Sequence, residues 1–295
     1  MATDTRALPL ALPLALPLPS SPFAITGQTR FLAIVADPIH HVKTPQYINE
    51  LLRAHAIDAV MVPLHVTADD FVVVMNALRC VANFSGCVVT VPHKTKAVAL
   101  CDEVSAEARQ IGAVNVVHRL ADGRLRGGML DGIGFVDGLR SAGIDPTGSS
   151  VYLAGAGGAA SAIAFALVQA GVSRLTVANR SAEKAMSLVE RLRAAHPAVN
   201  LSVGSSDASG HAIVVNATSL GLRPGDFLPL DVSTLDPAQI VAEIIMDPAE
   251  TALLKAARER GCRVHVGAPM LASQVRHMAA FMLDRPMPPM PPTSP

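Results

Sequence analysis

The stretch VYLAGAGGAASAIAFAL, Val151–Leu167, runs from an apolar segment into a glycine-rich turn and then into small, helix-favouring residues. The turn consists of Gly155, Ala156, Gly157, Gly158 and Ala159. Together with Ala160 it has the spacing G-x-G-x-x-A. The first glycine permits a tight turn, and the second lets the backbone approach a pyrophosphate at the helix N-terminus. The stretch therefore predicts a Rossmann-type unit that binds a dinucleotide, although a glycine turn without a ligand is the simpler alternative.

The next strand pattern, RLTVANRS, ends where an NAD site usually carries an acidic residue for the ribose hydroxyls. Asn179, Arg180 and Ser181 stand there instead, and Lys184 follows one helical turn after Arg180. A guanidinium and an ammonium attract a 2′-phosphate, which a carboxylate would repel. We therefore expect NADP as the cofactor. The alternative is that Arg180 and Lys184 are only the solvated start of a helix capped by Ser181.

Strand and helix patterns continue on both sides of this unit. Upstream, they alternate over 29–36, 44–57, 59–66, 68–81, 86–91 and 94–110. Residues 113–128 are typical of a hairpin around Asp122-Gly123, a second α/β series covers 150–221, and an amphipathic helix is expected over 270–283. This order predicts an α/β protein with a mainly parallel sheet and two domains joined near residue 130.

Composition narrows the functional classes. Lys and Arg total 24, Asp and Glu total 24, and aromatic residues make up 3%. The chain thus offers neither a basic field for a phosphate backbone nor stacking platforms for bases, and we expect no nucleic-acid partner. With 50% hydrophobic and 16% charged residues, it has the composition of a compact enzyme.

Cysteine and histidine spacing gives no metal signature. The four cysteines are Cys80, Cys87, Cys101 and Cys262. They have no C-x-x-C spacing, so we expect reduced core thiols in a cytoplasmic protein. The pair His40-His41 has no third ligand at a standard spacing, and a loop is expected there.

The N-terminus repeats an Ala-Leu-Pro-Leu unit within RALPLALPLALPLPSSPF, residues 6–23. Prolines at 9, 13, 17 and 19 would each remove a helical hydrogen bond, which argues against a signal peptide or a membrane anchor. We expect a disordered Pro/Leu-rich tail over 1–24 and a Pro-rich tail over 288–295.

A second informative stretch is GCVVTVPHK, Gly86–Lys94. Its β-branched run predicts a short buried strand, so Lys94 lies just past a strand end. In α/β proteins such ends face the ligand crevice, where a lysine can transfer a proton or hold an anion. The alternative is a solvated loop lysine.

The motifs VTVPHK, GAVNVV, LDGIGF, GAGGAA, NRS and NATSLG occur in this order, and with them the chain resembles the shikimate dehydrogenase family. The resemblance spans residues 30 to 284. It implies a substrate-binding domain over 25–129 completed by 268–287, and a Rossmann NADP-binding domain over 130–267. It also implies a cytoplasmic monomer or homodimer acting in aromatic amino acid biosynthesis.

The resemblance also implies roles for single residues. Lys94 and Asp131 would flank the reacting hydroxyl, with Lys94 exchanging its proton and Asp131 orienting Lys94. The implied substrate contacts are Thr44, Thr90, Asn115 and Gln274, together with position 42, which is Val42 here. The implied cofactor contacts include Asn216, Ala217 and Thr218, besides the glycine turn and residues 179–184.

The chain departs from the family in the expected substrate pocket. The family presents two hydroxyls, two residues apart, to the substrate carboxylate, whereas this chain has Val42 and Thr44. Further polar positions of the family are apolar here, at Val88, Met129, Leu130 and Met246. Each lost hydrogen bond costs about 1.5 to 3 kcal/mol of binding. Lys43 or His93 is a candidate to supply a compensating cation.

The sequence therefore predicts an NADP-dependent oxidoreductase that interconverts a ring hydroxyl and a ketone, with shikimate as the leading substrate. One alternative keeps the chemistry but changes the substrate to quinate, an aminoshikimate or a less hydroxylated cyclic acid. The other is a non-catalytic NADP-binding regulatory protein, against which the retained Lys94 and Asp131 argue.

Overall fold

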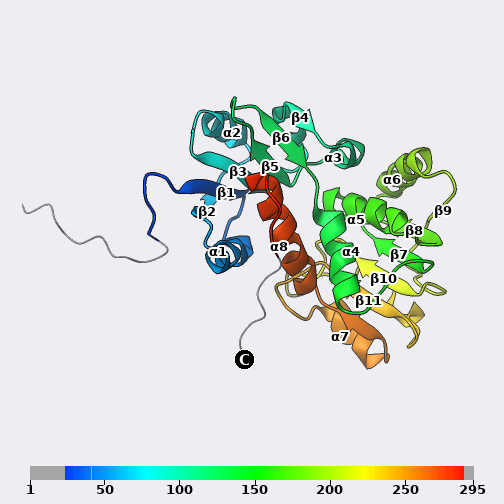
Figure 1. Cartoon of the computed structure of the whole chain (residues 1–295). Helices are drawn as coiled ribbons and strands as arrows, with labels where there is room; N and C mark the ends of the chain where they lie inside the picture. Colours follow the sequence, from blue (N-terminus) through cyan, green and yellow to red (C-terminus); the bar gives the residue numbers. More distant parts are fainter. Residues whose placement is uncertain (1–23, 41, 289–295) are drawn as a thin grey trace, which may run out of the picture.

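The computed structural model describes residues 24–40 and 42–288. The chain forms two β-sheets, and helices α4 (Asp131–Ser141) and α8 (Ala268–Leu283) lie between them (Figure 1). Except for Ala24 and Pro288, the two expected tails lie outside the described residues, as does His41. None of the described helices is both long and apolar enough to span a membrane.

The first sheet has the strand order β2-β1-β3-β5-β6-β4. Its strands are β1 (Arg30–Ala36), β2 (Ala59–His65), β3 (Phe84–Val89), β4 (Glu103–Val104), β5 (Val116–Arg119) and β6 (Leu125–Gly128). The first three pair in parallel, but β5 runs antiparallel to both β3 and β6. The hairpin β5–β6 thus adds two antiparallel pairings at one side of the sheet. The other three pairings, including that of β4 with β6, are parallel, so the sheet is mainly parallel, as expected.

Helices α1 (Thr44–Ala54), α2 (Phe71–Arg79) and α3 (Ala106–Ile111) accompany this sheet. The single helix expected over 94–110 is wrong: a 3-10 helix (Lys96–Leu100), strand β4 and α3 occupy that span. Cys101 is extended, and Asp102 exchanges hydrogen bonds with Leu125 at the start of β6. Pairing with a distant strand thus overrides local helix propensity here.

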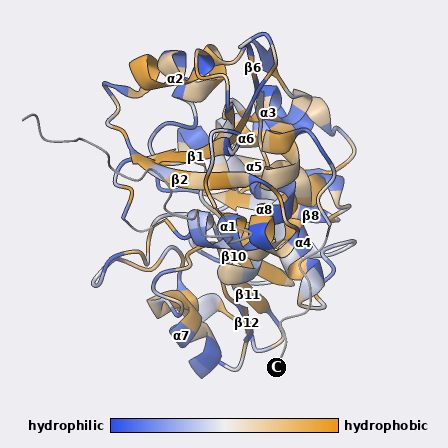
Figure 2. Cartoon of the chain, turned by 60° about the vertical axis from the view of Figure 1, so that its left-hand side comes forward, coloured by the Kyte–Doolittle hydropathy of each residue, from blue (hydrophilic) through white to orange (hydrophobic). Residues whose placement is uncertain are grey.

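The second sheet is fully parallel, with the order β12-β11-β10-β7-β8-β9. Its strands are β7 (Ser150–Ala154), β8 (Arg174–Ala178), β9 (Asn200–Val203), β10 (Ile213–Asn216), β11 (Ile240–Glu243) and β12 (Arg263–His265). Helices α5 (Gly158–Gln169), α6 (Ala182–Ala195) and α7 (Ala252–Glu259) connect them. In Figure 2 the strands β10 and β11 are apolar, whereas α7 carries apolar and polar residues on different faces. The order is that of a doubly wound dinucleotide-binding sheet, as the sequence predicts.

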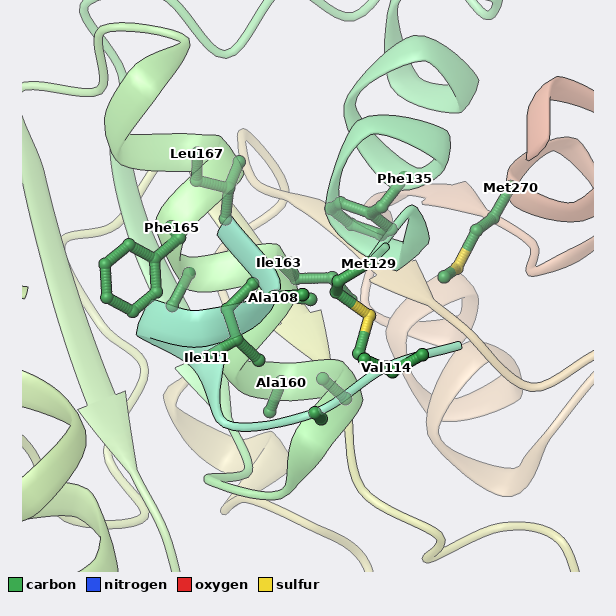
Figure 3. Packing of buried hydrophobic residues seen from close by; sticks show 14 of the residues in the cluster. Ala108, Ile111, Val114, Met129, Phe135, Ala160, Ile163, Phe165, Leu167 and Met270 are labelled. Atoms are coloured by element: carbon green, nitrogen blue, oxygen red, sulfur yellow. The ribbon is translucent and has the colours of Figure 1, made fainter. Parts of the chain in front are cut away.

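The last helix returns to the first sheet, as expected. Helix α8 packs against α1, β3 and β5 on one side and against α4 on the other. Met278 and Met282 are buried there together with Leu32 and Ile34 of β1. On the far side of α4, Phe135 and Ile163 pack together with α3 (Figure 3). Apolar packing therefore runs from one sheet to the other.

All four cysteines are free thiols. Cys87 and Cys262 are buried and Cys101 is half-buried, but Cys80 is exposed where α2 ends. The expectation of core thiols is therefore wrong for Cys80, which follows the last buried position of its helix, Leu78.

Candidate active site

Lys94 and Asp131 meet between the two sheets. The Lys94 Nζ donates to Asp131 Oδ2 at 2.6 Å, with 19% of the lysine side chain and 6% of the aspartate side chain exposed. Lys94 follows β3, and its carbonyl accepts from the Val114 backbone N–H. Asp131 is the first residue of α4, where the N-terminal end of the helix dipole favours an anion. Two elements thus fix this ion pair.

Two amide side chains hold the other oxygen of Asp131. Asn115 Nδ2 donates to Asp131 Oδ1 at 2.7 Å, and Gln274 Nε2 donates to the same atom at 3.0 Å. The backbone N–H of Leu130 in turn donates to Asn115 Oδ1 at 2.8 Å. We call Lys94, Asp131, Asn115 and Gln274 the polar cluster. Its carboxylate accepts three side-chain hydrogen bonds, so its orientation is fixed.

Gln274 reaches the cluster because α8 lies very close to α4. A Cβ added at Gly134 would lie 2.0 Å from the Cγ of Gln274. One turn further along, a Cβ at Gly138 would lie 3.0 Å from the backbone nitrogen of Met270. The glycines of GIGFVDG therefore permit a contact that brings a residue of the last helix to a site built mainly by the first half of the chain.

The cluster opens into a cavity of about 200 Å³. Every expected substrate position lines it, namely Val42, Thr44, Thr90, Asn115 and Gln274, as do Lys94 and Asp131. The sequence reasoning missed further lining residues, which are Ile34, Val89, Ile244, Gly267, Met270, Leu271 and Met278, whereas Ala159 was expected at the cofactor. Met270 and Met278 lie four residues on either side of Gln274, so helical spacing already indicates that all three share a face.

One side of the cavity is apolar. Val42, Val88 and Met246, which we call the apolar wall, line it and pack in one hydrophobic cluster. Ile34 joins them because it is the register partner of Val88. Lys43 also lines the cavity, with an exposed side chain.

Two of the expected pocket departures do not reach this cavity. Met129 packs near Phe135 and Ile163 (Figure 3), and Leu130 contributes its backbone to Asn115 and Gln274. Both residues border a separate groove beside α3 and α5, and neither is among the residues that line the cavity. The placement of Met129 and Leu130 in the substrate pocket is therefore wrong.

His93 is also not placed to supply the compensating cation for a substrate. Its ring stacks on Phe71 with centroids 4.3 Å apart, and its Nε2 bonds to the Val66 carbonyl at 2.8 Å. Burial lowers the pKa of His93 below its usual value. Among the two compensating candidates, only Lys43 lies at the cavity.

The glycine turn lies at the switch point of the second sheet, between β7 and β10. Gly155 has φ +121°, and a Cβ there would lie 2.8 Å from the Ala217 carbonyl oxygen. Gly157 is the N-cap of α5, and a Cβ there would meet no atom within 4 Å. Gly157 therefore leaves open the approach to the α5 N-terminus, as a bound pyrophosphate requires. Ala159, in the first turn of α5, connects this turn to the cavity.

Arg180 and Lys184 lie where the chain leaves β8 and enters α6, and both are exposed. Asn179 Nδ2 donates to the Ser181 carbonyl, and Ser181 Oγ caps α6 by accepting from the Lys184 N–H. Ser181 therefore caps α6, as the alternative interpretation expects. Arg180 and Lys184 both stay exposed, at the same edge of the sheet as the glycine turn. Residues of this kind fit the 2′-phosphate of NADP.

The parallel sheet, the glycine turn at its switch point and the buried Lys–Asp pair define a class, the dinucleotide-binding oxidoreductases. Family models match the chain as "Shikimate dehydrogenase substrate binding domain" over 34–117 and "Shikimate / quinate 5-dehydrogenase" over 140–221. The chain is 40% identical to a shikimate dehydrogenase (NADP(+)) of Rubrobacter xylanophilus, over 85% of this chain and 89% of that protein. The chain belongs to the shikimate dehydrogenase family.

Solved structures of two related enzymes have the same fold as this chain. The shikimate 5-dehydrogenase of Thermus thermophilus, in complex with NADP(H) and shikimate, has a TM-score of 0.80 at 30% identity, over 88% of this chain and 96% of that chain. A 5-ketofructose reductase of a Gluconobacter strain has a TM-score of 0.78 at 28% identity, over 88% of this chain and 95% of that chain.

Proposed function

We propose that this enzyme uses NADP to interconvert a ring hydroxyl and a ketone on a small cyclic hydroxy acid, with shikimate and 3-dehydroshikimate as the leading pair. The observation that carries the proposal is the Lys94–Asp131 pair, 2.6 Å apart at a cavity that reaches the first turn of α5. The relatives named shikimate dehydrogenase (NADP(+)) support the same substrate and cofactor.

The chain's own residues would handle the proton. NADP supplies the nicotinamide that accepts or returns a hydride. Lys94 takes the hydroxyl proton during oxidation and returns it during reduction, while Asp131 keeps the Nζ directed at the reacting oxygen. Asn115 and Gln274 hold Asp131 in place. Thr44 and Thr90 offer hydroxyls to the remaining substrate oxygens.

The cofactor would lie across the C-terminal ends of β7, β8 and β10. Residues 155–159 would receive the pyrophosphate, and residues 216–218 would form the opposite side of the crevice. Arg180 and Lys184 would pair with the 2′-phosphate, with Asn179 and Ser181 shaping the turn between them. Accordingly, 25–129 with 268–287 would form the substrate domain and 130–267 the NADP domain.

The apolar wall favours a second candidate, which is the same chemistry on a cyclic acid that carries fewer hydroxyls than shikimate. Val42, Val88 and Met246 cannot accept or donate a hydrogen bond, so a hydroxyl placed against them would be buried without a partner. The structural likeness to a 5-ketofructose reductase supports a family fold that accommodates substrates other than shikimate.

The proposal is tested by initial rates of nicotinamide reduction, with shikimate and quinate each offered NADP or NAD. We expect NADP-dependent turnover that Lys94→Ala lowers about a thousandfold. Lys96→Ala is the matched control, because Lys96 is an exposed lysine that donates to the Ala68 carbonyl away from the cavity. NADP binding without turnover of any ring alcohol would contradict the proposal and favour a regulatory protein.

A further inference from the structure

Glu243, the last residue of β11, is a fully buried carboxyl outside the cavity, with 0% of its surface exposed. Its Oε1 accepts from Asn216 Nδ2 at 3.0 Å and from Thr251 Oγ1 at 2.8 Å. Its Oε2 is buried as well and has no hydrogen-bond partner among the residues of the model that are described. Burying an acid that is only half satisfied destabilises a fold, so this position calls for a functional reason.

Burial raises the pKa of Glu243 to about 7, against smaller opposing effects of Asn216, Thr251 and the Ile245 N–H. These three groups face the carboxyl from β10, from the start of α7 and from the segment after β11. None of them titrates. The carboxyl therefore ionises near neutral pH without a cation to offset its charge.

Asn216 links Glu243 to the segment after β10. Asn216 Oδ1 accepts from the Thr218 N–H at 3.0 Å and from Thr218 Oγ1 at 2.7 Å. Its Nδ2 donates to the Leu220 carbonyl at 3.0 Å besides donating to Glu243. The Leu220 N–H closes the network by donating to Thr218 Oγ1. The side-chain amide of Asn216 thus binds the segment 216–220 at two residues, Thr218 and Leu220.

This segment lies directly against the glycine turn. The Ala217 N–H donates to the Ala154 carbonyl at 2.8 Å, and the Ala217 carbonyl occupies the space that a Cβ of Gly155 would need. A shift of the segment would therefore move one side of the nucleotide crevice.

We propose that Glu243 is a positioning residue that sets the orientation of the Asn216 amide, and through it the side of the crevice that receives the cofactor. This inference rests on the proposed NADP binding. An ionised carboxylate only accepts hydrogen bonds, so the Asn216 NH₂ must face it and the Asn216 oxygen must face Thr218. The Thr218 N–H and the Leu220 carbonyl require the same orientation, so a glutamine at position 243 would leave the amide in this orientation but would hold it less firmly. The bond to a carboxylate is also stronger than one between neutral groups.

The test compares Glu243→Gln with the wild-type chain at pH 8, where the carboxyl is mostly ionised. Because the buried charge is removed, we expect the melting temperature to rise by about 3 °C. We also expect the Kd for NADP, measured by calorimetric titration, to rise about fivefold. Glu259→Gln, an exposed exchange of the same type at the end of α7, should change neither quantity. A purely structural role would instead lower stability and affinity together.

A Glu243→Gln protein that loses stability, or that binds NADP with unchanged affinity, overturns the inference. If this variant does not fold, the inference is tested by measuring amide hydrogen exchange in the wild-type chain. The Thr218 and Leu220 amides should then be better protected at pH 8 than at pH 6, after correction for intrinsic rates, and equal protection overturns the inference. A wild-type chain that does not bind NADP would refute the proposed function itself, which is a separate result.

Discussion

The polar cluster and the apolar wall border the same cavity but differ in chemistry. In the cluster, Asp131 accepts hydrogen bonds from Lys94 after β3, from Asn115 just before β5 and from Gln274 of α8. In the wall, Val42, Val88 and Met246 pack as a hydrophobic core does. One cavity thus combines a hydrogen-bonded polar side with an apolar side, and the two sides can change independently within a family.

After the loss of Lys94 itself, the largest expected effect is at Asp131, in the polar cluster. Asp131→Asn removes the charge that orients Lys94, and we expect kcat to fall about a hundredfold with little change in KM. Steady-state rates at saturating NADP measure this change. Asp145→Asn, at an exposed turn, is the control. A loss confined to KM would place Asp131 in substrate binding instead of proton transfer.

The next largest effect is expected at the apolar wall. Val42→Ser places a hydroxyl next to Thr44, and we expect the KM for shikimate to fall about tenfold, because a polar substrate group then gains a partner. Val73→Ser, on the exposed face of α2, is the matched control. If Val42→Ser leaves the KM for shikimate unchanged, the wall does not contact the polar edge of the substrate.

A smaller effect is expected at the nucleotide end. Arg180→Ala removes a cation proposed to pair with the 2′-phosphate, so the Kd for NADP should rise about fivefold while that for NAD stays the same. Calorimetric titration of both nucleotides provides the internal control. Equal changes for the two nucleotides would show that Arg180 does not distinguish them.

The smallest expected effect is on the free energy of unfolding, and it comes from the buried carboxyl of Glu243. The pKa of Glu243 is raised from 4.5 to about 7, so the folded state holds a proton that the unfolded state has released. Its contribution therefore favours folding at low pH and declines as the pH rises from about 4.5 to 7. Glu243→Gln lacks this titration, so its advantage in unfolding free energy should grow by about 1 to 2 kcal/mol between pH 5 and pH 8. Denaturant titrations at both pH values measure it, and a constant difference would contradict the raised pKa.

Local patterns were enough to predict β1, β2, β3, β7, β8 and β10, the glycine turn and the hairpin around Asp122-Gly123, but they did not predict β9, β11, β12 or α7. The 94–110 segment was mispredicted, because the pairing of β4 with β6 depends on residues more than twenty positions away. The antiparallel direction of β5 depends on the same tertiary arrangement. Helical periodicity cannot show either feature.

For the site, motif order placed Lys94, Asp131 and Gln274 near one another, and the structure brings them together. Sequence alone could not show that Met129 and Leu130 turn away from the cavity, since that depends on the direction in which the chain enters α4. It also gave no signal for Glu243. The burial of an acid beside Asn216 and Thr251 is a property of the folded chain.

The most direct test measures kcat and KM for shikimate at saturating NADP in three proteins: wild type, Lys94→Ala and Met246→Tyr. The account predicts that Lys94→Ala lowers kcat about a thousandfold with KM nearly unchanged. Met246→Tyr, which returns a hydroxyl to the wall, should lower KM with kcat nearly unchanged. A Lys94→Ala protein with undiminished kcat, or two variants that change the same parameter, would contradict the division of the cavity into a polar cluster that transfers the proton and an apolar wall that contacts the substrate.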